Sequence, residues 1–209
     1  MFQVRRLLGY GAAAGPVYLV VGLAQVALRE GFDVRRHALS QLSNGDYGWV
    51  QIASFLTSGA LVLVGAWGIR RLLAGGRAGT WGPILLAGYG IGLIGAGIFI
   101  ADPARGFPPG TPLSNTPITT RGLMHFVFGG IGFYSLIAAC FVFARRFASL
   151  GRRVWALYSA FTGAGFFCAF AAIASGSTSV AIMLTFYAAV AWVWVWHTAL
   201  LVTQMRDAA

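Results

Sequence analysis

A few polar side chains in this sequence have the types needed for hydrolytic or metal chemistry. The four that we take as candidate catalytic residues are His37, Ser40, Asp102 and His125. A serine hydroxyl becomes a nucleophile when a neutral imidazole accepts its proton and a carboxylate orients that imidazole. Two imidazoles and a carboxylate can instead hold a metal ion and leave a position open for water or substrate. Neither a nucleophile elbow nor a spaced set of zinc ligands accompanies these residues, so the chemistry, the metal and the cofactor stay open.

A second group of residues is suited to binding an anionic ligand. Arg105 and Arg121 lie on either side of a loop rich in proline and glycine, and Gln41 belongs to an earlier polar segment. A guanidinium group presents several donors at once to phosphate or carboxylate oxygens. The structural alternative is that Asp102 pairs with Arg105 or Arg121 and caps the loop, while His125 is hydrogen-bonded among the helices. The sequence therefore leaves open whether the protein is an enzyme.

The composition indicates which elements must position these side chains. The sequence has 209 residues, of which 58% are hydrophobic and 10% charged, whereas soluble domains carry about 25% charged residues. Six apolar windows are each long enough, at about 20 residues, to cross a bilayer as a helix. They span residues 9–28, 51–69, 82–101, 122–144, 154–175 and 180–203. We expect an all-α fold in which residues 1–209 form a single six-helix transmembrane domain.

The basic residues predict how the chain crosses the membrane. Fifteen arginines against five acidic residues give a net charge of +10. The arginines occur mostly in pairs between the apolar windows, which is typical of membrane topology and not of nucleic-acid binding. Ten lie on the side of the two termini and five on the opposite side. The positive-inside rule therefore predicts a multi-pass protein of the cytoplasmic membrane with both termini in the cytoplasm.

The first outer loop predicts a short amphipathic helix over residues 33–44. Asp33 can cap the start of this helix and Gly45 can end it. At about 100° per residue, its polar and apolar residues fall on opposite faces. The polar face consists of His37, Ser40, Gln41 and Asn44. We expect the helix to cover an outward-facing pocket, with Asp102 and His125 at the same membrane level.

Other polar and small residues are expected to be structural. Gly88, Gly92 and Ala96 recur every four residues, a spacing that lets helices approach closely. Gln25 predicts a hydrogen bond between helices, and Pro16 predicts a kink.

The tryptophans and cysteines lead to two further expectations. We interpret a group in the last helix as an interfacial belt at its cytoplasmic end. This group consists of Trp192, Trp194, Trp196 and His197. Cys140 and Cys168 lie at different depths, so we expect two buried apolar residues without a disulfide.

The polar segments resemble those of a known family. They are the Arg-His-Ala-Leu-Ser-Gln-Leu segment from Arg36 to Leu42, the Asp102-Pro103 pair with its Gly-Phe-Pro-Pro-Gly-Thr loop, and His125 at the head of the fourth helix. In this combination the chain is similar to the prokaryotic membrane family catalogued as domain of unknown function 998. The resemblance implies a six-helix membrane protein. The family's loose grouping with eukaryotic Frag-type proteins of lipid-anchor remodelling implies, by analogy, a lipid-related role.

These features together favour an outward-facing polar pocket that recognises or processes a lipid headgroup at the outer leaflet. A membrane lipid is therefore the expected partner, and nucleic acid is not. The alternative is a non-catalytic accessory subunit of a larger membrane complex, in which small-residue helix faces dock another membrane protein or a second copy.

Overall fold

The computed structural model describes residues 2–73, 75–114 and 117–208. Within these ranges the secondary structure is helical, with no strand. The elements are α1 (Phe2–Ala12), α2 (Ala14–Leu28), the 3-10 helix η1 (Leu39–Ser43), α3 (Gly48–Leu72), α4 (Gly76–Ile98), α5 (Thr120–Ser149), α6 (Arg153–Ala174) and α7 (Val180–Asp207). Because α1 and α2 together make one span, six segments are long and apolar enough to cross a membrane. The predicted all-α fold with six spans is confirmed.

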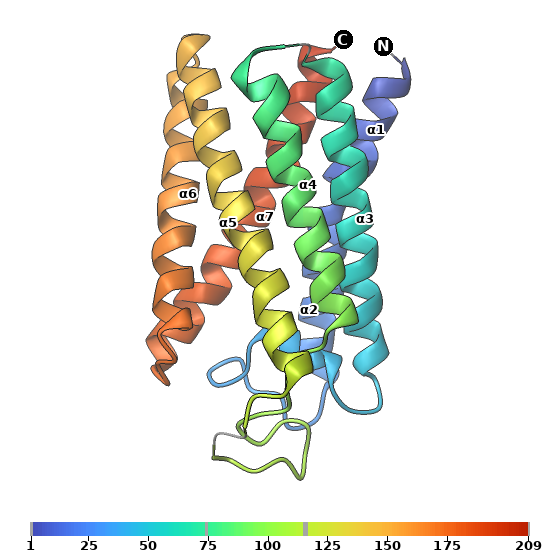
Figure 1. Ribbon diagram of the computed structural model, residues 1–209, viewed down its shortest axis with the longest axis vertical. Coiled ribbons are helices and arrows are strands. Elements are labelled where there is room, and N and C mark those ends of the chain that lie inside the picture. The colour runs from blue at the N-terminus through green and yellow to red at the C-terminus, as the bar shows by residue number, and fades with distance from the viewer. Residues whose placement is uncertain (1, 74, 115–116, 209) are drawn as a thin grey trace.

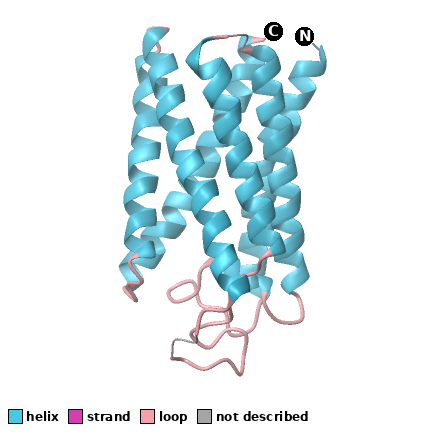
Figure 2. Ribbon diagram, in the orientation of Figure 1, coloured by secondary structure: helices cyan, strands magenta, loops and turns pink. Residues whose placement is uncertain are grey.

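The bundle has two different ends (Figure 1). Both chain termini lie at one end, which we call the terminal end, and the long connections 29–47 and 99–119 lie at the other, the loop end. Figure 2 shows how the irregular structure is concentrated at the loop end. Helix α4 packs between α3 and α5, α6 packs against α5, and α7 packs against α1, α2 and α6. The loop end is therefore the part of the molecule where polar side chains from several connections can meet.

The first span is interrupted where the sequence predicts a kink. Helix α1 ends at Ala12 and α2 begins at Ala14. Proline has no N–H, so Pro16 leaves the Ala12 carbonyl without its helical partner. The Thr198 hydroxyl of α7 donates to that carbonyl at 3.0 Å. A buried carbonyl in a membrane needs such a partner, and here it ties the first and last spans together.

A second proline, in α4, also frees a carbonyl that a side chain of another helix then binds. Pro83 lies inside this helix and leaves the Gly79 carbonyl unpaired. The Arg70 guanidinium of α3 donates to that carbonyl at 3.0 Å. The bond joins α3 to α4 near the terminal end.

Small residues allow the closest helix contacts, as the four-residue spacing predicts. A Cβ atom on Gly92 of α4 would lie 2.5 Å from the Cα of Gly132 in α5. Gly11 of α1 and Gly65 of α3 are in equally close contact. These glycines are therefore required by packing within the bundle itself.

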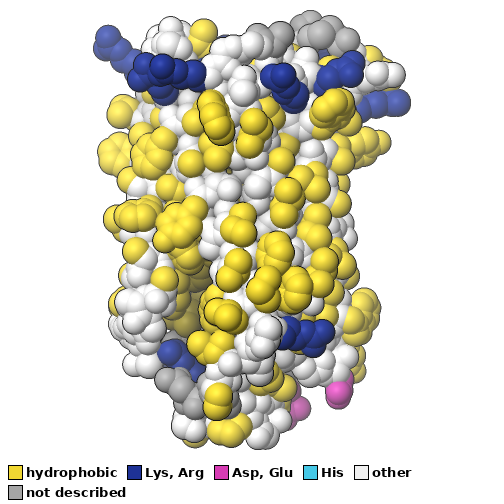
Figure 3. All heavy atoms as spheres, in the orientation of Figure 1, with side chains coloured by type: hydrophobic (Ala, Val, Ile, Leu, Met, Phe, Trp, Pro, Cys, Tyr) yellow, Lys and Arg dark blue, Asp and Glu magenta, His cyan; other side chains and the backbone are white. Residues whose placement is uncertain are grey.

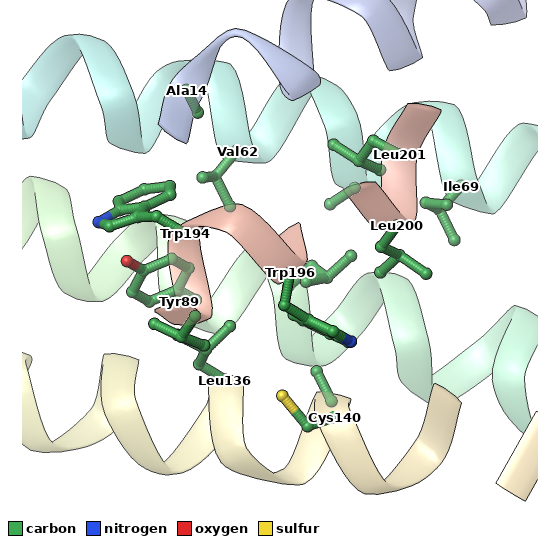
Figure 4. Close-up of a cluster of buried hydrophobic side chains, with 14 of the residues drawn as sticks. Ala14, Val62, Ile69, Tyr89, Leu136, Cys140, Trp194, Trp196, Leu200 and Leu201 are labelled. Atoms are coloured by element: carbon green, nitrogen blue, oxygen red, sulfur yellow. The ribbon is translucent and has the colours of Figure 1, made fainter. Parts of the chain in front are cut away.

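The core includes two of the tryptophans that we placed in an interfacial belt. Trp194 is 1% exposed and Trp196 is 0% exposed. Figure 4 shows both among the core side chains, with Trp196 directed toward Cys140 of α5 and Trp194 lying near Tyr89 of α4. The centroids of the Trp194 and Tyr89 rings are 5.2 Å apart.

The interfacial prediction is therefore wrong for most of this group. His197 is also fully buried, whereas Trp192 is exposed. The reason is that α7 crosses the bundle between α1, α2 and α6, so more than one of its faces is covered. The Trp196 indole N–H donates to the Ser159 hydroxyl of α6 at 3.0 Å, which satisfies it without an interface.

Two smaller expectations have separate outcomes. Gln25 donates to the Gln51 side-chain oxygen at 2.8 Å, so the predicted hydrogen bond between helices is confirmed. Both cysteines are free, and Cys140 is buried as expected. The same expectation is wrong for Cys168, which is exposed on the outer surface of α6.

The first loop differs from the expected continuous helix over residues 33–44. Residues 33–37 form a turn in which the Asp33 carbonyl accepts from the N–H groups of Arg36 and His37, each at 2.9 Å. Only the short helix η1 follows. The Asp33 carboxylate accepts from the Arg35 N–H at 2.9 Å, and such local side-chain bonds compete with helix formation. The polar residues of this segment are therefore not arranged along one helix face.

Candidate functional site

His37 holds two loops together at the loop end. It is 1% exposed, and its ring packs against the rings of Phe32 and Phe107, which also contact each other. The Asp33 N–H donates to His37 Nδ1 at 2.9 Å. Because Nδ1 accepts, Nε2 carries the proton and donates to the Arg105 carbonyl at 2.9 Å. With both ring nitrogens engaged, His37 serves to position Arg105.

Arg105 has a backbone conformation that its surroundings must maintain. Its φ of 54° is left-handed, which costs a residue other than glycine about 1–3 kcal/mol. The His37 bond and the reciprocal hydrogen bonds between Ala104 and Phe107 hold this turn. Backbone strain that is held in this way is concentrated at binding and active sites.

Asp102 joins the two ends of the long connection between α4 and α5. Its carboxylate accepts from the Thr119 N–H at 2.8 Å and from the Thr119 hydroxyl at 2.6 Å. The Thr119 oxygen in turn caps α5 by accepting from the Gly122 N–H at 3.1 Å. A Cβ atom at Gly122 would overlap the carboxylate, so glycine permits this approach. Asp102 thus caps the loop through Thr119, and within the described ranges it forms no ion pair with Arg105 or Arg121.

His125 lies in the second turn of α5 and is 7% exposed. Its Nδ1 is 2.8 Å from the Phe99 carbonyl oxygen and 3.1 Å from the Ala96 carbonyl oxygen. These carbonyls belong to the C-terminal end of α4, where a helix leaves carbonyl groups unpaired. His125 therefore joins the ends of α4 and α5 beside the Asp102 connection.

A large apolar cavity lies beneath these loops, with a volume of about 660 Å³. Its walls come from helices α2 to α7, and His125 and Ser40 line its end near the loops. Its deep end reaches Tyr89 and Trp194 in the core. Figure 3 shows a hollow lined by yellow, apolar side chains where the halves of α5 and α6 nearest the loop end diverge. The volume falls in the range of small-molecule and lipid sites.

A smaller pocket of about 420 Å³ adjoins this cavity. We call it the polar pocket because charged side chains belong to its lining, although most of its surface is apolar. The residues that line both spaces are Ala38, Ser40, Ile118, Phe126, Ile173 and Gly176. The polar pocket adds Arg36, Gln41, Asp102 and Arg105. The Gln41 side-chain oxygen is sealed from solvent without a hydrogen-bond partner. Together the two spaces form one site with a polar mouth and an apolar interior.

The two arginines of the polar pocket differ in how their charge is balanced. Arg36 Nε lies 3.3 Å from an Asp33 carboxylate oxygen. Hydrogen bonds from the Arg35 side chain and backbone lower the pKa of Asp33 to about 2, so its carboxylate stays charged. Arg105 has no ion pair in the part of the chain that the structure describes. Arg105 therefore supplies a positive charge that no ion pair neutralises, and the Asp102 carboxylate in the same lining is held by Thr119.

Comparison with known proteins adds a family to this geometry. The model of one family, described as Protein of unknown function (DUF998), matches residues 12–203. The chain belongs to this family. The match reaches into all six spans and includes both spaces of the site, which confirms the resemblance seen in the polar segments. A search of curated proteins gives no match. A search of solved structures gives none either.

In this DUF998 member the candidate catalytic residues lie in one region but do not form an assembled catalytic arrangement. His37, Asp102 and His125 each bond to their own backbone or threonine partners. No hydrogen bond joins Ser40 to either histidine in the described ranges. Nor do three His, Cys, Asp or Glu side chains among the described residues gather closely enough to hold a metal ion. What the site does provide is positive charge, hydrogen-bonding groups and apolar surface.

The fold separates the predicted binding residues. Arg105 and Gln41 line the polar pocket, whereas Arg121 is exposed and is not part of either lining.

The walls of the cavity include residues that the sequence analysis did not identify. Gly129 and Gly130 of α5 line it, and nothing lies within 4 Å of a Cβ atom added to either. The available signal is that this glycine pair does not follow the four-residue spacing of close helix packing.

Proposed function

We propose that the protein binds an anionic lipid at the loop end of the bundle. The lipid headgroup occupies the polar pocket and its acyl chain occupies the apolar cavity. The observation that carries this proposal is the shared wall of the two spaces, because a lipid requires a polar and an apolar compartment in contact.

The charge of the polar pocket supports an anionic headgroup. Arg105 has no ion-pair partner among the described residues, while Asp102 directs its carboxylate to Thr119. Arginine is well matched to phosphate oxygens because its donors form a planar fork. The His37 bond to the Arg105 carbonyl fixes the backbone from which this side chain extends at the pocket.

The shape of the apolar cavity supports entry from the bilayer. Phe126 and Tyr134 of α5 and Ala174 of α6 line the cavity and are also exposed on the outside of the bundle. Because these spans face lipid, an opening between them leads to the acyl region of the membrane. A chain can then enter sideways while its headgroup stays at the membrane surface.

The distribution of arginines supports binding from the outer leaflet. Basic side chains gather around the terminal end (Figure 3), which the positive-inside rule places in the cytoplasm. The loop end with its two pockets then faces outward in the cytoplasmic membrane. The accessory alternative has less support, because Gly11, Gly65, Gly92 and Gly132 are used for contacts inside the bundle.

The proposal is tested by comparing Arg105→Gln with Arg121→Gln. Purified protein in lipid nanodiscs is titrated with phosphatidic and lysophosphatidic acid, and with the corresponding phosphatidylcholines. We expect the anionic lipids to bind more tightly. Arg105→Gln should weaken their binding about tenfold, the effect of losing one hydrogen bond to a charged group. Arg121→Gln changes the same charge outside the pocket and should have little effect.

Two results would contradict this function. Equal affinity for anionic and zwitterionic lipids would remove the role of the polar pocket. An equal loss of affinity in the two arginine variants would show that net charge, and not Arg105, attracts the lipid.

A further inference from the structure

One ring nitrogen of His125, Nε2, has no hydrogen-bond partner among the described residues and is available to a ligand. Its Nδ1 lies within hydrogen-bond distance of two carbonyl oxygens, from Phe99 and Ala96. Carbonyl oxygens only accept, so Nδ1 must carry the proton of the neutral ring, and Nε2 keeps its lone pair. No described protein group donates to Nε2, and Nε2 is not among the polar atoms that are sealed from solvent. His125 therefore presents an unused hydrogen-bond acceptor.

This acceptor lies close to the boundary between the two spaces of the site. His125 lines the apolar cavity, and its neighbour Phe126 lines both the cavity and the polar pocket. Gly129 and Gly130 follow about one turn deeper along α5. An acceptor in a mainly apolar wall is unfavourable unless the occupant supplies a donor. The occupant should therefore carry an O–H or N–H group where its headgroup joins its chain.

The volume of the cavity limits the number of acyl chains. A methylene group is about the size of a water molecule, whose share of liquid volume is about 30 Å³. The cavity volume of about 660 Å³ therefore holds on the order of 20 such groups. That number fits one long acyl chain, and a second chain would have to lie outside the cavity.

We propose that the ligand is a single-chain anionic lipid with a free hydroxyl group next to its headgroup, the chemistry of a lysophospholipid. This inference rests on the proposed function and adds the ligand class. The phosphate lies at Arg105, the hydroxyl donates to His125 Nε2, and the chain extends past Gly129 toward Trp194. A diacyl lipid lacks this donor, because its second chain is esterified at that hydroxyl, and the cavity has space for only one of its two chains.

The test changes the ligand before it changes the protein. Wild-type protein in nanodiscs is titrated with oleoyl lysophosphatidic acid, with its analogue that lacks the free hydroxyl, and with dioleoyl phosphatidic acid. Native mass spectrometry reports binding, together with the intrinsic tryptophan fluorescence to which the cavity-lining Trp194 contributes. We expect lysophosphatidic acid to bind about tenfold more tightly than the deoxy analogue, the effect of one buried hydrogen bond. The diacyl lipid should bind more weakly than lysophosphatidic acid.

His125→Asn then tests the acceptor itself. The asparagine amide N–H₂ can replace Nδ1–H as the donor to the Phe99 and Ala96 carbonyls, but the side chain has no counterpart of Nε2. In this variant the two single-chain lipids should bind with equal affinity, while thermal stability stays close to that of the wild type. His125→Ala removes both functions and should lower stability as well.

The possible results distinguish a failure of the proposed ligand class from a failure of anionic-lipid binding. If the deoxy analogue or the diacyl lipid binds wild-type protein as tightly as lysophosphatidic acid, the ligand class is wrong while anionic-lipid binding stands. If the hydroxyl preference persists in His125→Asn, His125 is not the acceptor. If no anionic lipid binds better than its zwitterionic counterpart, the proposed function itself is wrong.

Discussion

A leucine at Gly129 should weaken chain binding about a hundredfold without unfolding the bundle. Gly129 lines the apolar cavity, and no heavy atom lies within 4 Å of a Cβ atom placed on it. Leucine adds four carbon groups at about 30 Å³ each, or about 120 Å³, to a cavity of about 660 Å³. A chain that fills the cavity must then expose about four methylene groups. At about 0.8 kcal/mol for each, the loss is about 3 kcal/mol, or about a hundredfold in affinity.

Gly165→Leu is the matched control for Gly129→Leu. Gly165 lies on α6, is exposed, has no heavy atom near an added Cβ and does not belong to the cavity lining. Lipid affinity is measured by titration in nanodiscs and stability by thermal unfolding in detergent. We expect both variants to unfold at the wild-type temperature, and only Gly129→Leu to lose the lipid. Undiminished binding in Gly129→Leu, or an equal loss in Gly165→Leu, would refute the assignment of this cavity to the acyl chain.

Three further predictions concern the bundle. Gly92→Leu should lower the stability in detergent by about 1–3 kcal/mol or prevent folding, because α4 and α5 must separate to admit the side chain; a wild-type unfolding temperature would contradict the packing role. Thr198→Val should cost about 1 kcal/mol by leaving a carbonyl unpaired, whereas Thr203→Val, which loses no hydrogen bond seen in the structure, should not; equal unfolding temperatures would show that this bond is not needed. In a variant without the native cysteines, Ser114→Cys should react with an impermeant thiol reagent in intact cells and Ser149→Cys only after permeabilisation, and the reverse pattern would invert the proposed orientation.

The sequence was most informative where the bilayer imposes one dominant constraint. An apolar window of about 20 residues has to form a helix, because a backbone in lipid must satisfy its own hydrogen bonds. The prolines were informative for the same reason. Pro16 predicted a kink, and its missing N–H leaves the Ala12 carbonyl free. The partner of that carbonyl is Thr198, which lies 186 residues from Ala12 along the chain and was not predictable.

Predictions failed where the outcome depended on which faces of a helix are covered. A tryptophan-rich segment near a helix end is typical of an interface, but Trp194 and Trp196 became core residues because α7 crosses the bundle. In the first loop, residues 33–44 satisfied the helical periodicity. Backbone N–H groups that donate to the Asp33 carboxylate and to the His37 ring nevertheless gave a turn, because short segments take their conformation from side-chain hydrogen bonds and tertiary contacts.

The sequence by itself determined the all-helical class, the six spans, the close packing of glycines and the set of polar residues at one end, since these follow from residue type and short-range spacing. Only the tertiary structure decided what each polar residue does there. His37, Asp102 and His125 share one region, yet each has a different partner. His37 bonds to Arg105, Asp102 to Thr119, and His125 to the end of α4. The apolar cavity likewise depends on how α5 and α6 diverge, a relation between helices that no local pattern encodes.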